Sequence, residues 1–213
     1  MARAVRHRFQ PLIHTVEPAY SVVSRSIAHP TTGDMRLRLE TARLVIRSFE
    51  PRDAEPWLAM VNDPEVGRFT PPSAPATLET FQGALERRRT MEREWGYAMW
   101  AVDLNETRTF VGQCGLYPAE SMGPEIEIGY HFTPVAWNRG YATEAATAAL
   151  AYGFGPLELD RVIALVMPEN VGSCRAVEKA SMRFEGIATY YGIAGLKKYI
   201  AERASWRSPQ GSA

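Results

Sequence analysis

Hydrophobic and polar residues alternate along several short stretches of the chain, the pattern of a strand with one buried face. In RLVIRSF (43–49), Leu44 and Ile46 fall on one face. In EIEIGYHF (125–132) the period is again two, and the strand ends near Thr133 because Pro134 cannot continue a ladder. We predict further strands over 97–104, 109–117, 161–167, 184–191 and 197–206.

Four stretches show helical patterns instead. Residues 77–94 place Leu78, Phe81 and Leu85 on one side, with Thr77 as the predicted N-cap. The Ala-rich stretch that begins at about Gly140 or Tyr141 and runs to Phe154 is strongly helix-prone. Further helices are predicted over 51–63, ending before Pro64, and over 173–182.

The predicted order of elements is β-α-α-β-β-β-α-β-α-β-β. This order indicates an α/β (α+β) fold, a mixed sheet with helices on both faces. Residues 1–35 carry several arginines and show no clear period, so we expect a loosely ordered extension before a single domain over 36–208.

Charge and cysteine usage exclude several classes of protein. The chain of 213 residues has 24 basic and 24 acidic residues, so no overall field attracts nucleic acid, and no apolar run approaches the roughly 18 residues of a membrane span. Cys114 and Cys174 have neither the number of a disulfide scaffold nor the spacing of a metal site. We therefore expect free thiols in a cytoplasmic protein without a metal, with a nucleophilic Cys174 as the alternative.

The turn WNRGYAT (137–143) stands between a strand and a helix, an arrangement suited to an anion. The first N–H groups of a helix have no partner within it, and the helix dipole adds positive charge there. Gly140 would let an anion approach the backbone, Asn138 tolerates left-handed geometry, and Arg139 adds charge. The glycine spacing matches neither the dinucleotide nor the triphosphate fingerprint. On this stretch alone, a simple surface turn remains the alternative.

Two motifs resemble those of the GCN5-related N-acetyltransferases, the GNAT family, in the branch that includes the ribosomal-protein N-terminal acetyltransferases. WNRGYA (137–142) is similar to the family's pyrophosphate loop, with Trp137 where Gln or Arg is usual. NVGSCRAVEKASMRFEG (170–186) is similar to its N-x-x-S helix. The resemblance runs from residue 39 to residue 206.

The resemblance implies the GNAT fold, a mostly antiparallel sheet whose two central parallel strands, here 126–132 and 161–167, splay apart. It implies acetyl-CoA as the co-substrate, with pantetheine along the first of these strands and pyrophosphate on the turn. The implied cofactor-binding residues are His131, Phe132, Thr133, Trp137, Asn138, Arg139, Gly140, Tyr141, Ala142, Thr143, Asn170 and Ser173.

An amine acceptor arrives mostly as an ammonium ion, so a base is required. Alternation places Glu125, Glu127 and His131 on one strand face, and Glu127 matches the carboxylate position of the family. Glu127 is our predicted base, and His131 is the alternative. The family's tyrosine acid is replaced by Val177, which leaves Ser173 either as a proton donor to the leaving thiolate or as a helix N-cap.

The predicted function is transfer of an acetyl group to a primary amine, either a protein N-terminus or a small molecule. The segment 61–75 is expected to wall the acceptor site, and the branch is compatible with a homodimer. The alternative is a non-catalytic acyl-CoA-binding module or sensor. Binding to nucleic acid has only the N-terminal arginines in its favour, and no membrane partner is expected.

Overall fold

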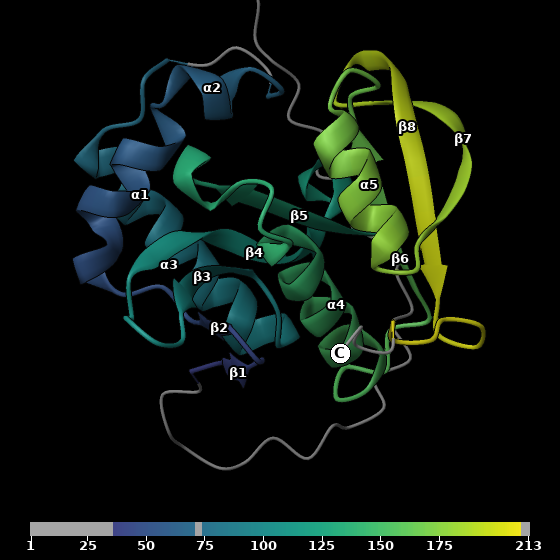
Figure 1. Cartoon of the computed structure of the whole chain (residues 1–213), viewed down its shortest axis with the longest axis horizontal. Helices are drawn as coiled ribbons and strands as arrows, with labels where there is room; N and C mark the ends of the chain where they lie inside the picture. Colours follow the sequence, from purple (N-terminus) through teal and green to yellow (C-terminus); the bar gives the residue numbers. More distant parts are fainter. Residues whose placement is uncertain (1–35, 71–73, 210–213) are drawn as a thin grey trace, which may run out of the picture. The chain divides into compact units, whose positions relative to one another are not determined.

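The computed structural model describes residues 36–70 and 74–209, so the predicted extension over 1–35 lies outside the described residues. Figure 1 shows a sheet with helices along it. The strands are β1 (Arg38–Glu40), β2 (Leu44–Arg47), β3 (Met99–Leu104), β4 (Phe110–Pro118), β5 (Ile126–Phe132), β6 (Arg161–Val166), β7 (Arg183–Tyr190) and β8 (Ile193–Glu202). The helices are α1 (Ala54–Val61), α2 (Pro64–Gly67), α3 (Leu78–Trp95), α4 (Tyr141–Phe154) and α5 (Val171–Lys179). Short 3-10 turns cover Pro51–Asp53, Ala119–Ser121 and Pro134–Ala136.

The eight strands form one sheet in the order β1-β2-β3-β4-β5-β6-β8-β7. Every neighbouring pair is antiparallel except β5 and β6, which run parallel. The predicted mixed fold is confirmed, and β1 and α2 were not predicted. Pro64 does not simply end a helix: it is the first residue of α2, where the missing N–H of proline does no harm.

The two sheet faces are covered by different helices, as the alternation in β3 shows. Trp100 and Val102 belong to the main core with α4, whereas Ala101 between them packs with Trp57 of α1 and Phe81 of α3. Figure 1 shows α4 and α5 next to each other over the central strands, and the two helices are in contact.

Small residues allow α4 to lie close to the sheet. Ala145, Ala146 and Ala149 are fully buried. A Cβ on Gly153 would come within 3.1 Å of Leu116 Cδ1 of β4. The Ala-rich composition that predicted a helix therefore also sets the distance between this helix and the strands beneath it.

Among the described strands, the sheet is nearly interrupted at the one parallel pairing, between β5 and β6. The register between β5 and β6 consists of one pair, Glu127 with Ile163, whereas β4 pairs with β5 over seven residues, from Gly112 with Phe132 to Pro118 with Ile126. The carboxyl halves of β5 and β6 consequently diverge, and the space between them opens at the ends that lead into α4 and α5.

Among residues 36–70 and 74–209, no helix is both long and apolar enough to cross a membrane. In the same part of the chain, no group of three or more His, Cys, Asp and Glu residues is arranged to hold a metal ion.

Candidate active site

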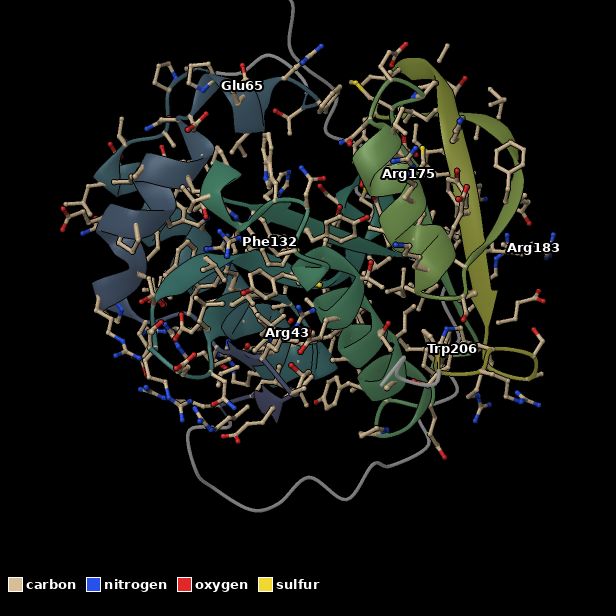
Figure 2. The ribbon with its side chains drawn as sticks, viewed as in Figure 1. Arg43, Glu65, Phe132, Arg175, Arg183 and Trp206 are labelled. Carbon is tan, nitrogen blue, oxygen red and sulfur yellow. The ribbon has the colours of Figure 1, made fainter. Side chains whose placement is uncertain are left out.

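A pocket of about 530 Å³ lies where β5 and β6 diverge. Its walls are the end of β5, the turn before α4, the first turns of α5, and α2 with the residues after it. In Figure 2, Glu65 on α2 and Arg175 on α5 stand on opposite sides of this region, and both line the pocket. The predicted acceptor segment 61–75 therefore contributes Glu65, Val66 and Phe69 to the same pocket.

The turn before α4 has the left-handed backbone that its sequence indicated. Asn138 has φ 58° and Gly140, the N-cap of α4, has φ 78°. Arg43 of the β1–β2 connection braces the turn: its guanidinium donates 2.8 Å to the Arg139 carbonyl and 2.7 Å to Glu144 Oε2. Burial disfavours ionised Glu144, but hydrogen bonds from Thr41 and Arg43 outweigh it and lower the pKa of Glu144.

The residues around the α4 N-terminus fit a phosphate-bearing ligand. A Cβ at Gly140 would come within 3.3 Å of Arg43 Nη2. Glycine therefore lets the Arg43 guanidinium lie close to the turn, in addition to providing the positive φ. Arg175 and Lys179, one turn apart on α5, line the opposite wall. Together with the first N–H groups of α4 they supply the positive charge that a pyrophosphate requires.

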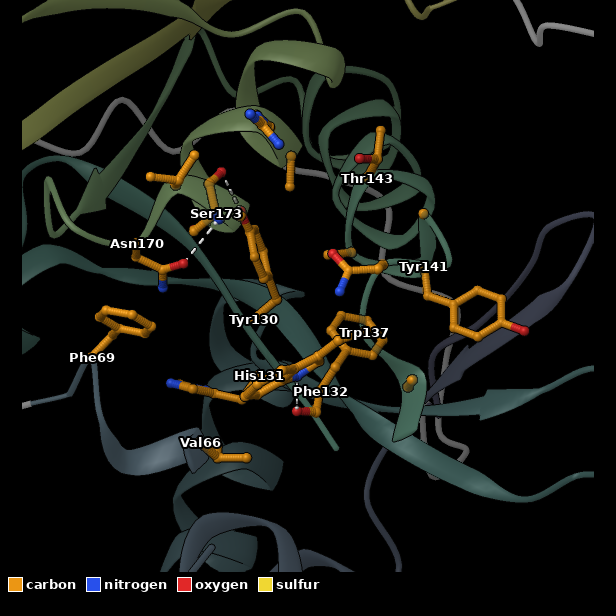
Figure 3. A pocket seen from close by; sticks show the side chains of 18 of the residues that line it. Val66, Phe69, Tyr130, His131, Phe132, Trp137, Tyr141, Thr143, Asn170 and Ser173 are labelled. Atoms are coloured by element: carbon orange, nitrogen blue, oxygen red, sulfur yellow. Dashed lines mark hydrogen bonds between the residues drawn. The ribbon is translucent and has the colours of Figure 1, made fainter. Parts of the chain in front are cut away.

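All of the predicted cofactor-binding residues line this pocket except Thr133 and Arg139. The Thr133 N–H donates 2.9 Å to the Val111 carbonyl, and its side chain also faces that carbonyl. Along an antiparallel ladder, the backbone N–H and C=O groups of successive residues point alternately to one neighbour and to the other. Since the groups of Thr133 point to β4, the backbone groups of Tyr130 and Phe132 point into the gap between β5 and β6. The Phe132 carbonyl accepts a 2.7 Å hydrogen bond from Trp137 Nε1, which gives this unusual tryptophan a structural role (Figure 3).

At the start of α5, the N-cap is Asn170 and not Ser173. The helix begins two residues earlier than predicted, and Asn170 Oδ1 accepts a 3.0 Å hydrogen bond from the Ser173 N–H. The alternative of Ser173 as the helix cap is therefore wrong. Its hydroxyl instead lies 2.9 Å from the Tyr130 hydroxyl, inside the pocket, as Figure 3 shows.

His131 lines the pocket and is held by a polar chain behind it. Gln113 Oε1 accepts from Trp57 Nε1 and from Arg88 Nη2, each at 2.9 Å, so the Gln113 amide nitrogen is left to donate to His131 Nδ1 at 3.1 Å. This fixes the proton of neutral His131 on Nε2. Burial, together with the Arg88 charge, lowers the pKa of His131. Because Nδ1 is occupied and Nε2 is protonated, His131 is arranged as a donor and not as a base.

Glu127 is buried, with 5% of its surface exposed, and lies outside the residues that line the pocket. It occupies the single β5–β6 pair, whereas Glu125, which alternation placed on the same strand face, lies just before the first residue of β5. Tyr191 donates 2.6 Å to Glu127 Oε2, and Tyr117 hydrogen-bonds the same carboxylate. Burial raises the pKa of Glu127 to about 7, although both hydrogen bonds act to lower it.

Sequence reasoning missed the tyrosines of this site. Tyr117 lies opposite Glu127 on β4, and Gly129, two residues along β5, leaves space for it. A Cβ on Gly129 would lie 2.6 Å from the Tyr117 hydroxyl. A glycine in the middle of an alternating strand was the available signal, because it indicates a close approach by another group. Tyr130 and Tyr191 gave no comparable signal.

Comparison with known proteins identifies the family. The description "Acetyltransferase (GNAT) domain" matches residues 43–183, and the chain belongs to this family. It is an enzyme of the N-acetyltransferase class, and the family uses acetyl-CoA. The family and the fold predicted from the two motifs are thus confirmed.

Individual relatives agree. The chain is 33% identical over 171 residues to "Uncharacterized N-acetyltransferase YnaD" of Bacillus subtilis, covering 80% of this chain and 92% of that protein. A crystal structure of a GNAT-family acetyltransferase from Bacillus anthracis is 30% identical, with a TM-score of 0.67, covering 79% of this chain and all of that one. RimJ of Mycobacterium smegmatis in complex with CoA-disulfide has a TM-score of 0.66 at 20% identity, covering 78% and 85%; at that identity the likeness concerns the fold alone.

Proposed function

We propose that the protein transfers an acetyl group from acetyl-CoA to a primary amine by direct attack of the amine on the thioester. The observation that carries the proposal is the placement of Glu127. A buried carboxylate with a raised pKa stands at the point where β5 and β6 separate, and the pocket opens beyond it. A binding module would have no need of such a group.

The pKa of Glu127 favours an α-amine as acceptor. An α-ammonium has a pKa of about 7.7–8.0 and an alkylammonium about 10.4. A base with a pKa of about 7 takes a proton from the first against a gap of roughly one unit, and from the second against more than three. The acceptor we propose is therefore a peptide N-terminus or another molecule with an α-amine, in preference to a lysine side chain or a polyamine.

The other residues of the site are proposed to contact different parts of acetyl-CoA, the acyl donor. The α4 N-terminus, Arg175 and Lys179 hold the pyrophosphate, and the gap-facing backbone of Tyr130 and Phe132 holds the pantetheine arm. Ser173 Oγ, held by Tyr130, returns a proton to the leaving thiolate. His131 Nε2–H is available as a donor to a developing oxyanion.

The test measures free-thiol release from acetyl-CoA with three acceptors: a peptide with a free α-amine, the same peptide N-acetylated but with a lysine, and a polyamine. We expect release with the first acceptor. We expect Glu127→Gln to lose about 10²-fold or more in turnover while acetyl-CoA binding, followed by calorimetry, changes less than about twofold. Glu86→Gln, the same change at an exposed position of α3, is the matched control.

Two results would oppose the proposal. Release no faster than hydrolysis with every amine would support a non-catalytic acyl-CoA-binding module. Full turnover in the Glu127→Gln protein would leave acetyl transfer in place but remove Glu127 as the base.

A further inference from the structure

We infer that Tyr191 is a catalytic proton relay: its hydroxyl accepts the proton from the acceptor ammonium and passes its own proton to Glu127. This inference rests on the proposed function and names a residue that the two sequence motifs do not include. Three observations support it. Glu127 is buried, its two hydroxyl partners Tyr117 and Tyr191 differ in exposure, and Tyr191 has an uncommon backbone conformation in the turn between β7 and β8.

Glu127 has two hydroxyl partners, and they differ in access to solvent. Glu127 itself is only 5% exposed, so a bulky acceptor cannot approach its carboxylate directly. The Tyr117 hydroxyl lies against Gly129 inside the sheet, where burial raises its pKa. Tyr191 is 42% exposed and still donates 2.6 Å to Glu127 Oε2. Of the two tyrosines, Tyr191 is the more exposed, since Tyr117 is half-buried and its hydroxyl packs against Gly129.

The backbone of Tyr191 is an uncommon one for this residue type. Tyr190 pairs with Ile193, so β7 and β8 are joined by the two residues Tyr191 and Gly192. Their φ values are 54° and 71°, the two positive angles of a type I′ turn. Glycine and asparagine suit such positions, and a bulky aromatic residue is strained there. Such strain at an unusual residue points to a role for its side chain.

Neighbouring contacts hold this turn over β5. The Tyr191 N–H donates 2.9 Å to Glu120 Oε1. Lys198 Nζ lies 2.8 Å from Glu125 Oε1 and 2.9 Å from the Tyr190 hydroxyl, and Tyr190 also hydrogen-bonds Glu125. Glu125 lies immediately before β5 and two residues before Glu127, so the anchoring of Tyr190 to Glu125 helps to set the position of Tyr191, which hydrogen-bonds Glu127. The relay is thus preorganised before the acceptor arrives.

The proposed step is balanced in protons and electrons. One N–H bond of the acceptor ammonium breaks, and its proton forms a bond with Tyr191 Oη. The Tyr191 O–H bond breaks in concert, and that proton bonds to Glu127 Oε2. The amine keeps the electron pair with which it attacks, Glu127 becomes neutral, and Tyr191 is neutral before and after. Burial and the hydrogen bond to Glu127 raise the pKa of Tyr191, so it does not carry the charge itself.

Tyr191→Phe and Tyr117→Phe form a matched pair for the test, because each removes one hydroxyl that hydrogen-bonds Glu127. Both changes should move the acidic limb of the rate–pH profile to higher pH, since each removes stabilisation of the carboxylate. Only Tyr191→Phe should also lower the plateau kcat above that limb, by about 10²-fold, against at most about threefold for Tyr117→Phe. The KM for acetyl-CoA should change less than twofold in both.

A proton inventory in mixtures of H₂O and D₂O gives a second readout that a structural role would not alter. The wild-type plateau rate should depend on the deuterium fraction with the curvature of two moving protons. Equal plateau rates for the two variants, with the curvature retained in Tyr191→Phe, would overturn the relay. Undiminished turnover in Glu127→Gln would instead contradict the proposed base, so the two failures are distinguishable.

Discussion

The Tyr130 hydroxyl lies 2.9 Å from Ser173 Oγ and 3.1 Å from the Ser173 carbonyl, joining the strand of the divided sheet to the first turn of α5. In the proposed reaction this pair takes the role that the resemblance assigns to a tyrosine at position 177, where this chain has a fully buried valine. The acid of the proposed reaction therefore comes from the helix start and is oriented by a neighbouring strand residue.

Ser173→Ala should lower kcat by about tenfold. The effect is expected to be smaller than the 10²–10⁴ typical of acid–base groups, because a thiol with a pKa near 8.5 departs with little help. Tyr130→Phe should lower kcat by a smaller factor, since it only releases the Ser173 hydroxyl from its position. Thiol-release kinetics at saturating acetyl-CoA measure both, and a Ser173→Ala protein with wild-type kcat would remove this serine from the mechanism.

Stability should depend on pH through Glu127. Its pKa rises from 4.5 to about 7 on folding, so between these values the folded state binds the additional proton and stability falls as pH rises. The destabilisation, on the order of 3 kcal/mol, is complete above pH 7 and absent below pH 4.5. Urea unfolding at pH 5 and pH 8 should show wild type losing more stability than Glu127→Gln over this interval. Parallel losses in both proteins would contradict the raised pKa.

Removal of the positive charges on α5 should weaken donor binding. Arg175→Ala and Lys179→Ala should each raise the Kd for CoA by up to about fivefold, as expected for exposed charge contacts, and the effect should shrink at high salt. Arg183→Ala is the control of equal charge, because Arg183 is exposed on β7 and does not line the pocket. An equal rise in the Kd for CoA in all three variants would indicate that the net charge of the protein matters and not a local contact with the donor.

Arg47 should be a major contributor to stability without a role in catalysis. It is buried between Asp53 and Asp103, with contacts of 2.8 and 2.7 Å, and so connects β2 to β3 and to the start of α1. Arg47→Met leaves two buried carboxylates unpaired and should lower the free energy of unfolding by about 3–5 kcal/mol. Arg38→Met removes an exposed pair and should change it by less than about 1 kcal/mol. Chemical denaturation compares the two, and similar values would contradict the buried network.

Local sequence patterns predicted most of the helices and strands. The errors concern two elements that are too short to show a period and the start of one helix. β1 has only three residues, and α2 is a single turn, so neither is long enough to show a period. The predicted start of α5 is two residues too late, and the cap, which was one of the two roles open for Ser173, is Asn170, three residues before that serine. Caps are short signals, and Asn and Ser are nearly equal candidates.

The residues predicted for the donor half of the site are nearly contiguous in sequence, and most of them line one pocket. The turn over 137–143 and the start of α5 are each a few residues long. The spacing of residues within them is what indicates a phosphate-binding site. The acceptor half depends on long-range pairs: Glu127 meets Tyr117 across a ladder and Tyr191 across 64 residues of chain. No local pattern encodes such a meeting, because it results from the order of strands in the sheet.

The single residue pair between β5 and β6 has a mechanical consequence. The two halves of the sheet share a single residue pair, so parting them breaks few backbone hydrogen bonds, and their spacing depends largely on side-chain packing beneath α4 and α5. In the proposed function, the acyl donor lies between the two halves and hydrogen-bonds to β5 as an added strand would. Its arrival should therefore be visible as slowed hydrogen exchange at the gap-facing amides of Tyr130 and Phe132, while the amide of Thr133, already bonded to Val111, is protected throughout.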